Sequence, residues 1–175
     1  EFNKEAVQNN SPQSSDNYVL ENKELKNLKE DLNKIVIDYF EKVVCTNSSI
    51  FPHITQSWFT VTRHGMSHRI HKHANSYLSG TFYMYDVKPE DKVIFHKKHY
   101  DLNDILLPER TSFNLYNSET WFLPAAPGKL MLFPSDISHH VSPMEGTHVR
   151  TSLAFNTFLR GRLGYQTALS QLYLK

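Results

Sequence analysis

The sequence predicts a mainly β protein, an antiparallel β-sandwich or jelly roll with helix only near its ends. Two observations favour this fold class. Short segments rich in β-branched and aromatic residues alternate with turns that contain Pro, Asn and Gly. The 175 residues also include 11 Phe, 9 Tyr and 2 Trp, which is enough bulky side-chain surface for one core.

The N-terminal part of the chain predicts a tail followed by a helix. Residues 1–17 are polar and lack periodicity, which is typical of a mobile tail, and we expect residues 18–175 to form a single domain. From Leu20 to Val44 the apolar residues recur at helical spacing, which predicts an amphipathic helix packed on the outside of the domain. Its apolar positions are Leu25, Leu28, Leu32, Ile35, Val36, Tyr39, Phe40 and Val43.

The rest of the chain predicts strands and loops. Residues 101–121 are rich in turn formers, which predicts a long loop that borders a site. Residues 161–175 are expected to form a short strand or helix on the outside. The strand candidates are Ser57–Thr62, Tyr77–Asp86, Val93–His96, Lys129–Phe133 and Val149–Leu159.

Charge and composition exclude several classes of partner. Nineteen Lys and Arg against 18 Asp and Glu leave a net charge of +1, so nucleic acid is not an expected partner. No apolar stretch is long enough to span a bilayer, so no membrane partner is expected either. A single cysteine, Cys45, excludes internal disulfides and predicts a cytoplasmic location, with its thiol buried.

Histidines are concentrated in two short stretches. Side chains at i and i+2 of a strand share a face, so His71 and His73 could reach one metal ion, whereas His68 has the opposite parity. His139 follows a predicted strand and turn and could supply a third ligand from a neighbouring strand. Taken alone, each group could equally be a set of exposed polar residues. The two stretches contain His64, His68, His71 and His73, and then His139, His140 and His148.

Arg150 and Ser152 have the spacing of one strand face. A guanidinium with a nearby hydroxyl suits a carboxylate, because the arginine fork makes two charge-assisted hydrogen bonds. The rest of this strand is apolar, so an inward Arg150 would need a counter-anion. The alternative is an arginine that points outward at a sheet edge.

These pieces together resemble the 2-oxoglutarate/Fe(II)-dependent dioxygenases, and most closely their small bacterial and phage branch. The resemblance runs from about Trp58 to Asn156, more than half of the chain. The matching stretches are His71–Tyr83 (HKHANSYLSGTFY), Pro127–Ser135 (PGKLMLFPS), His139–Pro143 (HHVSP) and Arg150–Asn156 (RTSLAFN).

The resemblance implies a double-stranded β-helix, a distorted jelly roll, with Fe(II) as cofactor and 2-oxoglutarate and dioxygen as cosubstrates. It implies hydroxylation of an unidentified protein or small-molecule substrate, with release of succinate and CO2. His71 and His139 would be metal ligands, and Arg150, assisted by Ser152, would bind the far carboxylate of 2-oxoglutarate. Tyr83 would be a further cosubstrate contact or, equally, an aromatic residue that lines the barrel.

One position departs from the family pattern. His73 stands where most members have a carboxylate, and we favour it as the third metal ligand. The alternatives are a carboxylate from elsewhere, such as Asp86, or a site with two protein ligands. Three histidines also resemble the cupin dioxygenases that use no 2-oxoglutarate, although Arg150 and Ser152 argue against that function. A non-catalytic metal-binding jelly roll is the remaining alternative.

Overall fold

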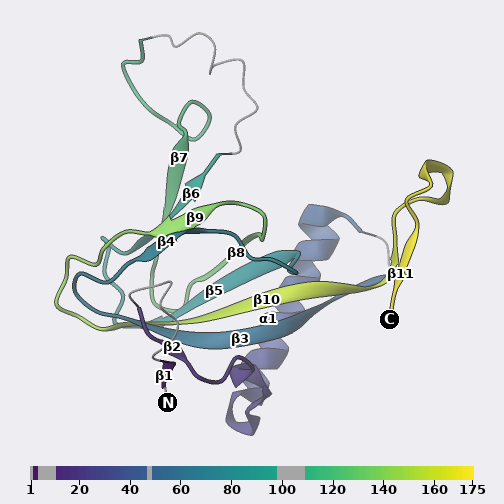
Figure 1. Cartoon of the computed structure of the whole chain (residues 1–175), viewed down its shortest axis with the longest axis horizontal. Coiled ribbons are helices and arrows are strands. Elements are labelled where there is room, and N and C mark those ends of the chain that lie inside the picture. The colour runs from purple at the N-terminus through teal and green to yellow at the C-terminus, as the bar shows by residue number, and fades with distance from the viewer. Residues whose placement is uncertain (1, 4–10, 47–48, 98–108) are drawn as a thin grey trace.

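The computed structural model describes residues 2–3, 11–46, 49–97 and 109–175. Within these ranges the chain forms two antiparallel sheets, one of seven strands and one of four (Figure 1). The larger sheet contains β1 (Phe2–Asn3), β2 (Gln13–Ser14), β3 (Ile50–Thr62), β10 (Arg150–Leu163), β5 (Leu78–Tyr85), β8 (Leu130–Pro134) and β11 (Leu172–Leu174). The smaller sheet contains β4 (His68–His71), β9 (His139–Val141), β6 (Lys92–His96) and β7 (Thr120–Pro124).

This arrangement confirms the predicted mainly β jelly roll. All five predicted strands are present, and three of them, β3, β6 and β10, are longer than their sequence signals. β10 lies in the middle of the larger sheet, between β3 and β5. A small core of Tyr83, Val87, Val93, Ala125 and Met131 joins residues of both sheets.

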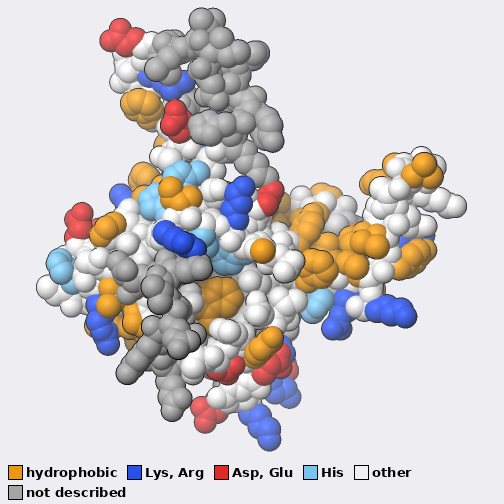
Figure 2. Space-filling model, viewed as in Figure 1, with side chains coloured by type: hydrophobic (Ala, Val, Ile, Leu, Met, Phe, Trp, Pro, Cys, Tyr) orange, Lys and Arg blue, Asp and Glu red, His pale blue; other side chains and the backbone are white. Residues whose placement is uncertain are grey.

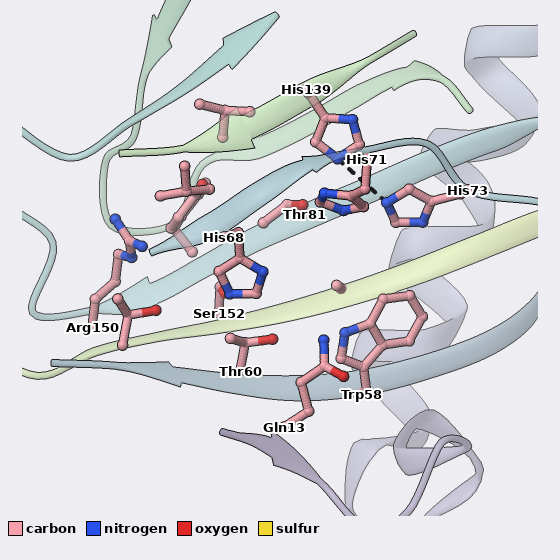
Figure 3. A pocket seen from close by; sticks show the side chains of 15 residues that line it. Gln13, Trp58, Thr60, His68, His71, His73, Thr81, His139, Arg150 and Ser152 are labelled. Atoms are coloured by element: carbon pink, nitrogen blue, oxygen red, sulfur yellow. Dashed lines mark hydrogen bonds between the residues drawn. The ribbon is translucent and has the colours of Figure 1, made fainter. Parts of the chain in front are cut away.

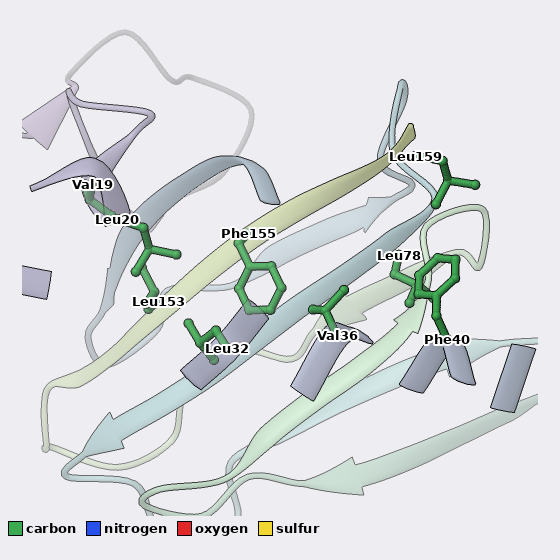
Figure 4. Packing of buried hydrophobic residues seen from close by; sticks show 9 residues of the cluster. All are labelled: Val19, Leu20, Leu32, Val36, Phe40, Leu78, Leu153, Phe155 and Leu159. Atoms are coloured by element: carbon green, nitrogen blue, oxygen red, sulfur yellow. The ribbon is translucent and has the colours of Figure 1, made fainter. Parts of the chain in front are cut away.

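The predicted outer helix is also confirmed. After two short 3-10 turns, η1 (Val19–Glu21) and η2 (Lys23–Leu25), comes α1 (Lys26–Tyr39), which continues as a π-helical turn, η3 (Phe40–Val44). The helix covers the larger sheet on the face away from the smaller one (Figures 1 and 4). The main hydrophobic core lies between them and contains Val19, Leu20, Leu32, Val36, Phe40, Leu78, Leu153, Phe155 and Leu159.

Gly80 allows this core to close. A Cβ atom at position 80 would lie 2.2 Å from Cζ of Phe155, which sits on the neighbouring strand β10. The Phe155 ring therefore occupies the space that a side chain at position 80 would need, which accounts for the glycine in the middle of β5.

Two predictions for the N-terminal part need correction. Residues 11–17 of the predicted mobile tail lie along β3, because Gln13 pairs with Thr60 and the Ser57 N–H donates to the Asn17 carbonyl. These contacts satisfy backbone groups at the β3 edge; residues 4–10 lie outside the described residues. Cys45 is exposed rather than buried, because it follows η3 in a left-handed conformation that ends the helix.

The C-terminal part combines both predicted alternatives, a short 3-10 helix, η5 (Gln166–Ala168), and the strand β11. Figure 2 shows hydrophobic side chains gathered over the end of β10 and β11, and Leu169 is 96% exposed. Of the predicted loop 101–121, residues 101–108 lie outside the described residues, and β7 begins at Thr120. None of the helices in the described ranges has the length and apolar character that crossing a bilayer requires.

Candidate metal and cosubstrate site

Two of the predicted ligands lie opposite each other across a strand pair. β4 pairs with β9 so that His71 is the register partner of His139, and their ring centroids are 4.3 Å apart. Cross-strand partners project on the same side of a sheet. The smaller sheet therefore brings together two histidines that are far apart in the sequence, as predicted.

The third histidine reaches the same place from outside a strand. β4 ends at His71, so His73 does not share a strand face with it as predicted. Instead the His73 N–H donates to the carbonyl oxygen of Ser135 at 3.0 Å, which fixes the chain as it turns back toward β5. Ligand atoms of His71, His73 and His139 all lie within 4.8 Å of one another (Figure 3).

The chemistry of this donor set fits a divalent transition metal. The Nδ1 atom of each ring bonds to an oxygen: the carbonyls of Arg69 (2.8 Å, from His71) and Ile137 (3.0 Å, from His139), and the side chain of Asn156 (2.7 Å, from His73). Such outer bonds orient imidazole ligands and leave Nε2 for the metal. Imidazole suits iron, zinc and nickel alike.

Burial favours the neutral, metal-binding form of two candidate ligands, His139 and His73. Burial and, to a smaller extent, the neighbouring histidines lower the pKa of His139 to about 3, although the bond to Ile137 opposes the change. Burial likewise lowers the pKa of His73, with Asn156 opposing the change. Neutral imidazole is the ligand form, so these shifts favour metal binding at neutral pH.

Aromatic side chains form the wall around the three histidines. The Phe133 ring meets the His139 ring edge-on, with ring centroids 4.7 Å apart, and the centroid of the Phe95 ring lies 6.0 Å from that of His139. Trp58, from β3 of the facing sheet, stacks on His73 with centroids 6.0 Å apart. The site is therefore a partly apolar chamber between the two sheets.

Arg150 points inward, and the counter-anion that it needs is Asp91. Both residues are 4% exposed, and Nη1 of Arg150 donates to Oδ1 of Asp91 at 2.7 Å. The other oxygen of Asp91 bonds to Nε2 of His148 at 2.8 Å and accepts from the Lys88 N–H at 2.9 Å. Nε of Arg150 is buried and has no hydrogen-bond partner, which leaves a donor available to a further carboxylate.

Ser152 and Tyr83 lie beside Arg150 in the same cavity as the three histidines. Ser152 and Tyr83 are register partners on β10 and β5. Arg150 and Ser152 line the same cavity from one strand, as their spacing predicts. Tyr83 is almost completely buried, and burial raises the pKa of its hydroxyl to about 12, although Arg150 opposes that change. A neutral phenol is available there as a hydrogen-bond donor.

His68 also faces this cavity, contrary to its predicted parity. The β4–β9 register shifts between His68 and His71, and this irregularity turns both side chains toward the larger sheet (Figure 3). Burial, together with the nearby His71 and Arg150, lowers the pKa of His68 to about 4. His68 is therefore within electrostatic reach of both ends of the cavity.

The remaining residues show where sequence reasoning was incomplete. Asp86, the alternative ligand, is bonded to Lys88 and to the Val149 N–H and does not belong to the histidine group. Sequence reasoning gave no role to Asp91 or Asn156. Asn156 lies an even number of positions from Arg150 and Ser152 on the same strand, so its inward orientation could have been predicted from theirs. No spacing signal points to Asp91.

A jelly roll with histidines converging between its sheets defines a class of metal-binding double-stranded β-helix proteins. Residues 56–156 match the family described as "Putative 2OG-Fe(II) oxygenase". This match covers more than half of the chain, and the chain belongs to that family. No curated protein matches it in sequence.

Solved structures support the fold. A Pseudomonas putida prolyl-4-hydroxylase superposes with a TM-score of 0.58 at 13% identity, covering 89% of this chain and 77% of that one. A Burkholderia pseudomallei oxidoreductase of the 2OG-Fe(II) oxygenase family gives a TM-score of 0.56 at 13% identity and covers 77% of this chain. The match spans only 55% of the length of the Burkholderia protein.

Proposed function

We propose that this chain is an Fe(II)- and 2-oxoglutarate-dependent dioxygenase that hydroxylates an unidentified substrate. The observation that carries the proposal is one cavity with two complementary ends. Three convergent imidazoles lie at one end, and Arg150, with its unpartnered Nε, lies at the other. A dicarboxylate that chelates a metal with one end and needs a cation for the other matches this pair of features.

His71, His73 and His139 would hold the iron. The bound iron, 2-oxoglutarate and dioxygen supply an oxidant that inserts one oxygen atom into a substrate C–H bond, while the other enters succinate and CO2 is released. The protein residues hold the donor set in place through their Nδ1 bonds and surround it with Phe95, Phe133 and Trp58. Those apolar rings limit the access of water to the metal.

Arg150 would bind the far carboxylate of 2-oxoglutarate, with Ser152 and Tyr83 as neighbouring hydroxyl donors. Asp91 already balances the guanidinium charge through one nitrogen, so the cosubstrate would use the donors that Asp91 leaves free. A molecule that reaches from Arg150 to the histidines would lie against His68 or displace it. We also propose that the protein acts in the cytoplasm and that its substrate is a protein side chain or a small metabolite.

The test of this function is succinate production. Purified protein with Fe(II), 2-oxoglutarate and air should convert 2-oxoglutarate into succinate, and a true substrate should stimulate the conversion. Candidate peptides and metabolites are screened by this stimulation. A protein that binds both Fe(II) and 2-oxoglutarate yet releases no succinate with any of them would instead fit the non-catalytic jelly roll.

We predict that Arg150→Lys lowers the affinity for 2-oxoglutarate by about tenfold or more and leaves metal affinity unchanged. Lysine keeps the charge but loses the planar fork, and a charge-assisted hydrogen bond is worth about 1.5–3 kcal/mol. Titration calorimetry of Mn(II)-loaded protein under anaerobic conditions measures both affinities. Equal 2-oxoglutarate binding in the variant and the wild type would remove Arg150 from the cosubstrate site.

We also predict that His73→Asp still binds iron and keeps some activity. The change recreates the two-histidine, one-carboxylate ligand set, and a carboxylate needs no deprotonation near neutral pH. His73→Ala should weaken metal binding more than His68→Ala, because only His73 belongs to the convergent group. Metal content after dialysis compares the three variants, and loss of metal from His68→Ala alone would reverse the assignment.

The three-histidine donor set favours one second candidate, a cupin-like dioxygenase that uses no 2-oxoglutarate. The buried Arg150 would then have only a structural role, paired with Asp91. That enzyme would consume oxygen with a substrate of its own, and added 2-oxoglutarate would change neither the rate nor the products.

A further inference from the structure

The three candidate ligands differ in what fixes their protonation pattern. His71 and His139 place Nδ1 against backbone carbonyl oxygens. A carbonyl oxygen can only accept, so each Nδ1 must carry the hydrogen, and each neutral ring keeps a bare Nε2. Backbone carbonyl groups therefore hold these two rings in the tautomer that can bind a metal through Nε2.

His73 depends on a side chain instead. Its Nδ1 lies 2.7 Å from Oδ1 of Asn156, on β10. An amide offers an acceptor oxygen at one position and a donor NH2 at the other. With the oxygen facing His73, Nδ1 donates and Nε2 is bare; with the amide reversed, Nδ1 accepts and the hydrogen moves to Nε2. The orientation of Asn156 thus decides whether His73 can be a ligand through Nε2.

A group of buried hydroxyls surrounds the Asn156 amide. Ser79 Oγ, from β5, donates to Oδ1 of Asn156 at 3.1 Å, and this donor supports the first orientation. Ser135 Oγ lies 2.8 Å from Ser79 Oγ and 2.7 Å from Ser76 Oγ. Ser79 and Ser135 are buried and Asn156 is 8% exposed, so this local network, rather than bulk water, governs the choice.

Ser135 connects this network to both ligand-bearing segments. Its carbonyl accepts from the His73 N–H, and the residue lies in the turn that leads from β8 to His139. One cluster of small polar residues thus orients the His73 ring and ties its backbone to the segment that carries a second ligand.

The contact at the centre of the site defines the competing tautomer, because a His73 that carried its hydrogen on Nε2 would donate it to the bare Nε2 of His139. Nε2 of His73 and Nε2 of His139 lie 3.3 Å apart (Figure 3). When both Nδ1 atoms carry the hydrogens, neither Nε2 has one, and two lone pairs face each other. A cation between them relieves the resulting repulsion.

We propose that Asn156 is a positioning residue that holds His73 in its Nδ1–H tautomer and so makes it a metal ligand, with Ser79 and Ser135 holding Asn156. The inference rests on the metal site of the proposed function but not on 2-oxoglutarate.

The direct test is the tautomer of His73 in metal-free protein. Long-range 1H–15N spectra of 15N-histidine-labelled protein distinguish a protonated Nδ1 from a protonated Nε2, and His73→Asp identifies the signals. We expect the Nδ1–H form in the wild type and in Asn156→Asp, which keeps an acceptor, and its loss in Asn156→Leu. A wild-type His73 that is protonated at Nε2 overturns the proposal without any variant.

Zn(II) affinity, measured against a chromophoric chelator, provides the second readout. Asn156→Leu should bind Zn(II) about 10–100-fold more weakly, the usual effect of losing such an outer partner, and Asn156→Asp should bind at least as tightly as the wild type. Thr62→Val, which removes a buried hydroxyl from the neighbouring strand β3, is the matched control and should not change the affinity. Unchanged affinity in a folded Asn156→Leu contradicts the proposal.

Two further results test this proposal independently of the folding of Asn156→Leu and of the proposed function. Ser79→Ala removes the hydroxyl that contacts both Oδ1 of Asn156 and Ser135 but leaves Asn156 in place, so a milder loss of Zn(II) affinity is expected even if Asn156→Leu does not fold. The His73 tautomer is independent of turnover. Protein that shows the Nδ1–H form but never consumes 2-oxoglutarate would therefore refute the proposed function and leave the role of Asn156 intact.

Discussion

Replacing His139 with alanine will abolish the binding of one divalent metal ion and the stabilisation that the ion gives. His139 is the most enclosed of the three ligands, and it contacts both His71 and His73, with ring centroids 4.3 and 5.1 Å away. Its loss leaves two imidazoles, too few to hold an ion firmly. The change is measured as the rise in thermal midpoint on adding Mn(II), since a ligand that binds only the native state stabilises it.

The matched control for this prediction is His64→Ala. His64 lies in an exposed turn, bonded to the Glu145 carbonyl and outside the histidine group. It should keep the full response to Mn(II), and His71→Ala should lose it. If His139→Ala and His71→Ala both retain a one-equivalent site of unchanged affinity, the metal lies elsewhere in the protein.

Replacing Asp91 with asparagine will destabilise the protein by about 3–5 kcal/mol, the usual cost of removing one partner of a buried ion pair. Asp91 is the only carboxylate that the described residues place against the buried guanidinium of Arg150, and it also binds His148. Total stabilities are about 5–15 kcal/mol, so this loss would be visible in any unfolding experiment. Urea denaturation of the metal-free protein measures it.

Asp86→Asn is the control for the charge itself. Asp86 also pairs with a lysine, but that pair is exposed to solvent, so its removal should change stability little. Asparagine also tolerates the left-handed backbone found at position 86. Similar urea midpoints for the two variants would mean that the Asp91–Arg150 pair is not the buried support described above.

The strands that could be predicted are those with local signals. Alternation and β-branched residues indicated β5, β8 and β10. β4 and β9 are short and rich in histidine, so they were not among the strand candidates, and a strand at His71 was inferred only from the histidine spacing. Their pairing is set by contacts between residues far apart in the sequence. The same holds for residues 11–17, whose polar sequence is typical of a tail but whose backbone finds partners on β3.

The candidate site likewise contains residues that could be predicted from the sequence and residues that could not. His71, His139 and Arg150 could be predicted because they fall in recognisable motifs and follow strand spacing. Asp91 could not, since it reaches Arg150 from 59 residues away and from a loop without a pattern. The predicted orientation of His68 was wrong because the prediction assumed a regular strand. The local sequence carries no signal for the register shift in β4.

The binding of 2-oxoglutarate with and without metal tests the central claim most directly. Anaerobic calorimetry compares metal-free protein with protein loaded with Mn(II), and Arg150→Lys serves as a third sample. We predict that one equivalent of 2-oxoglutarate binds to the loaded wild type, and much more weakly when either the metal or the arginine fork is missing. Binding that is equal with and without metal, or no binding to the loaded protein, would contradict a cosubstrate held between the three histidines and Arg150.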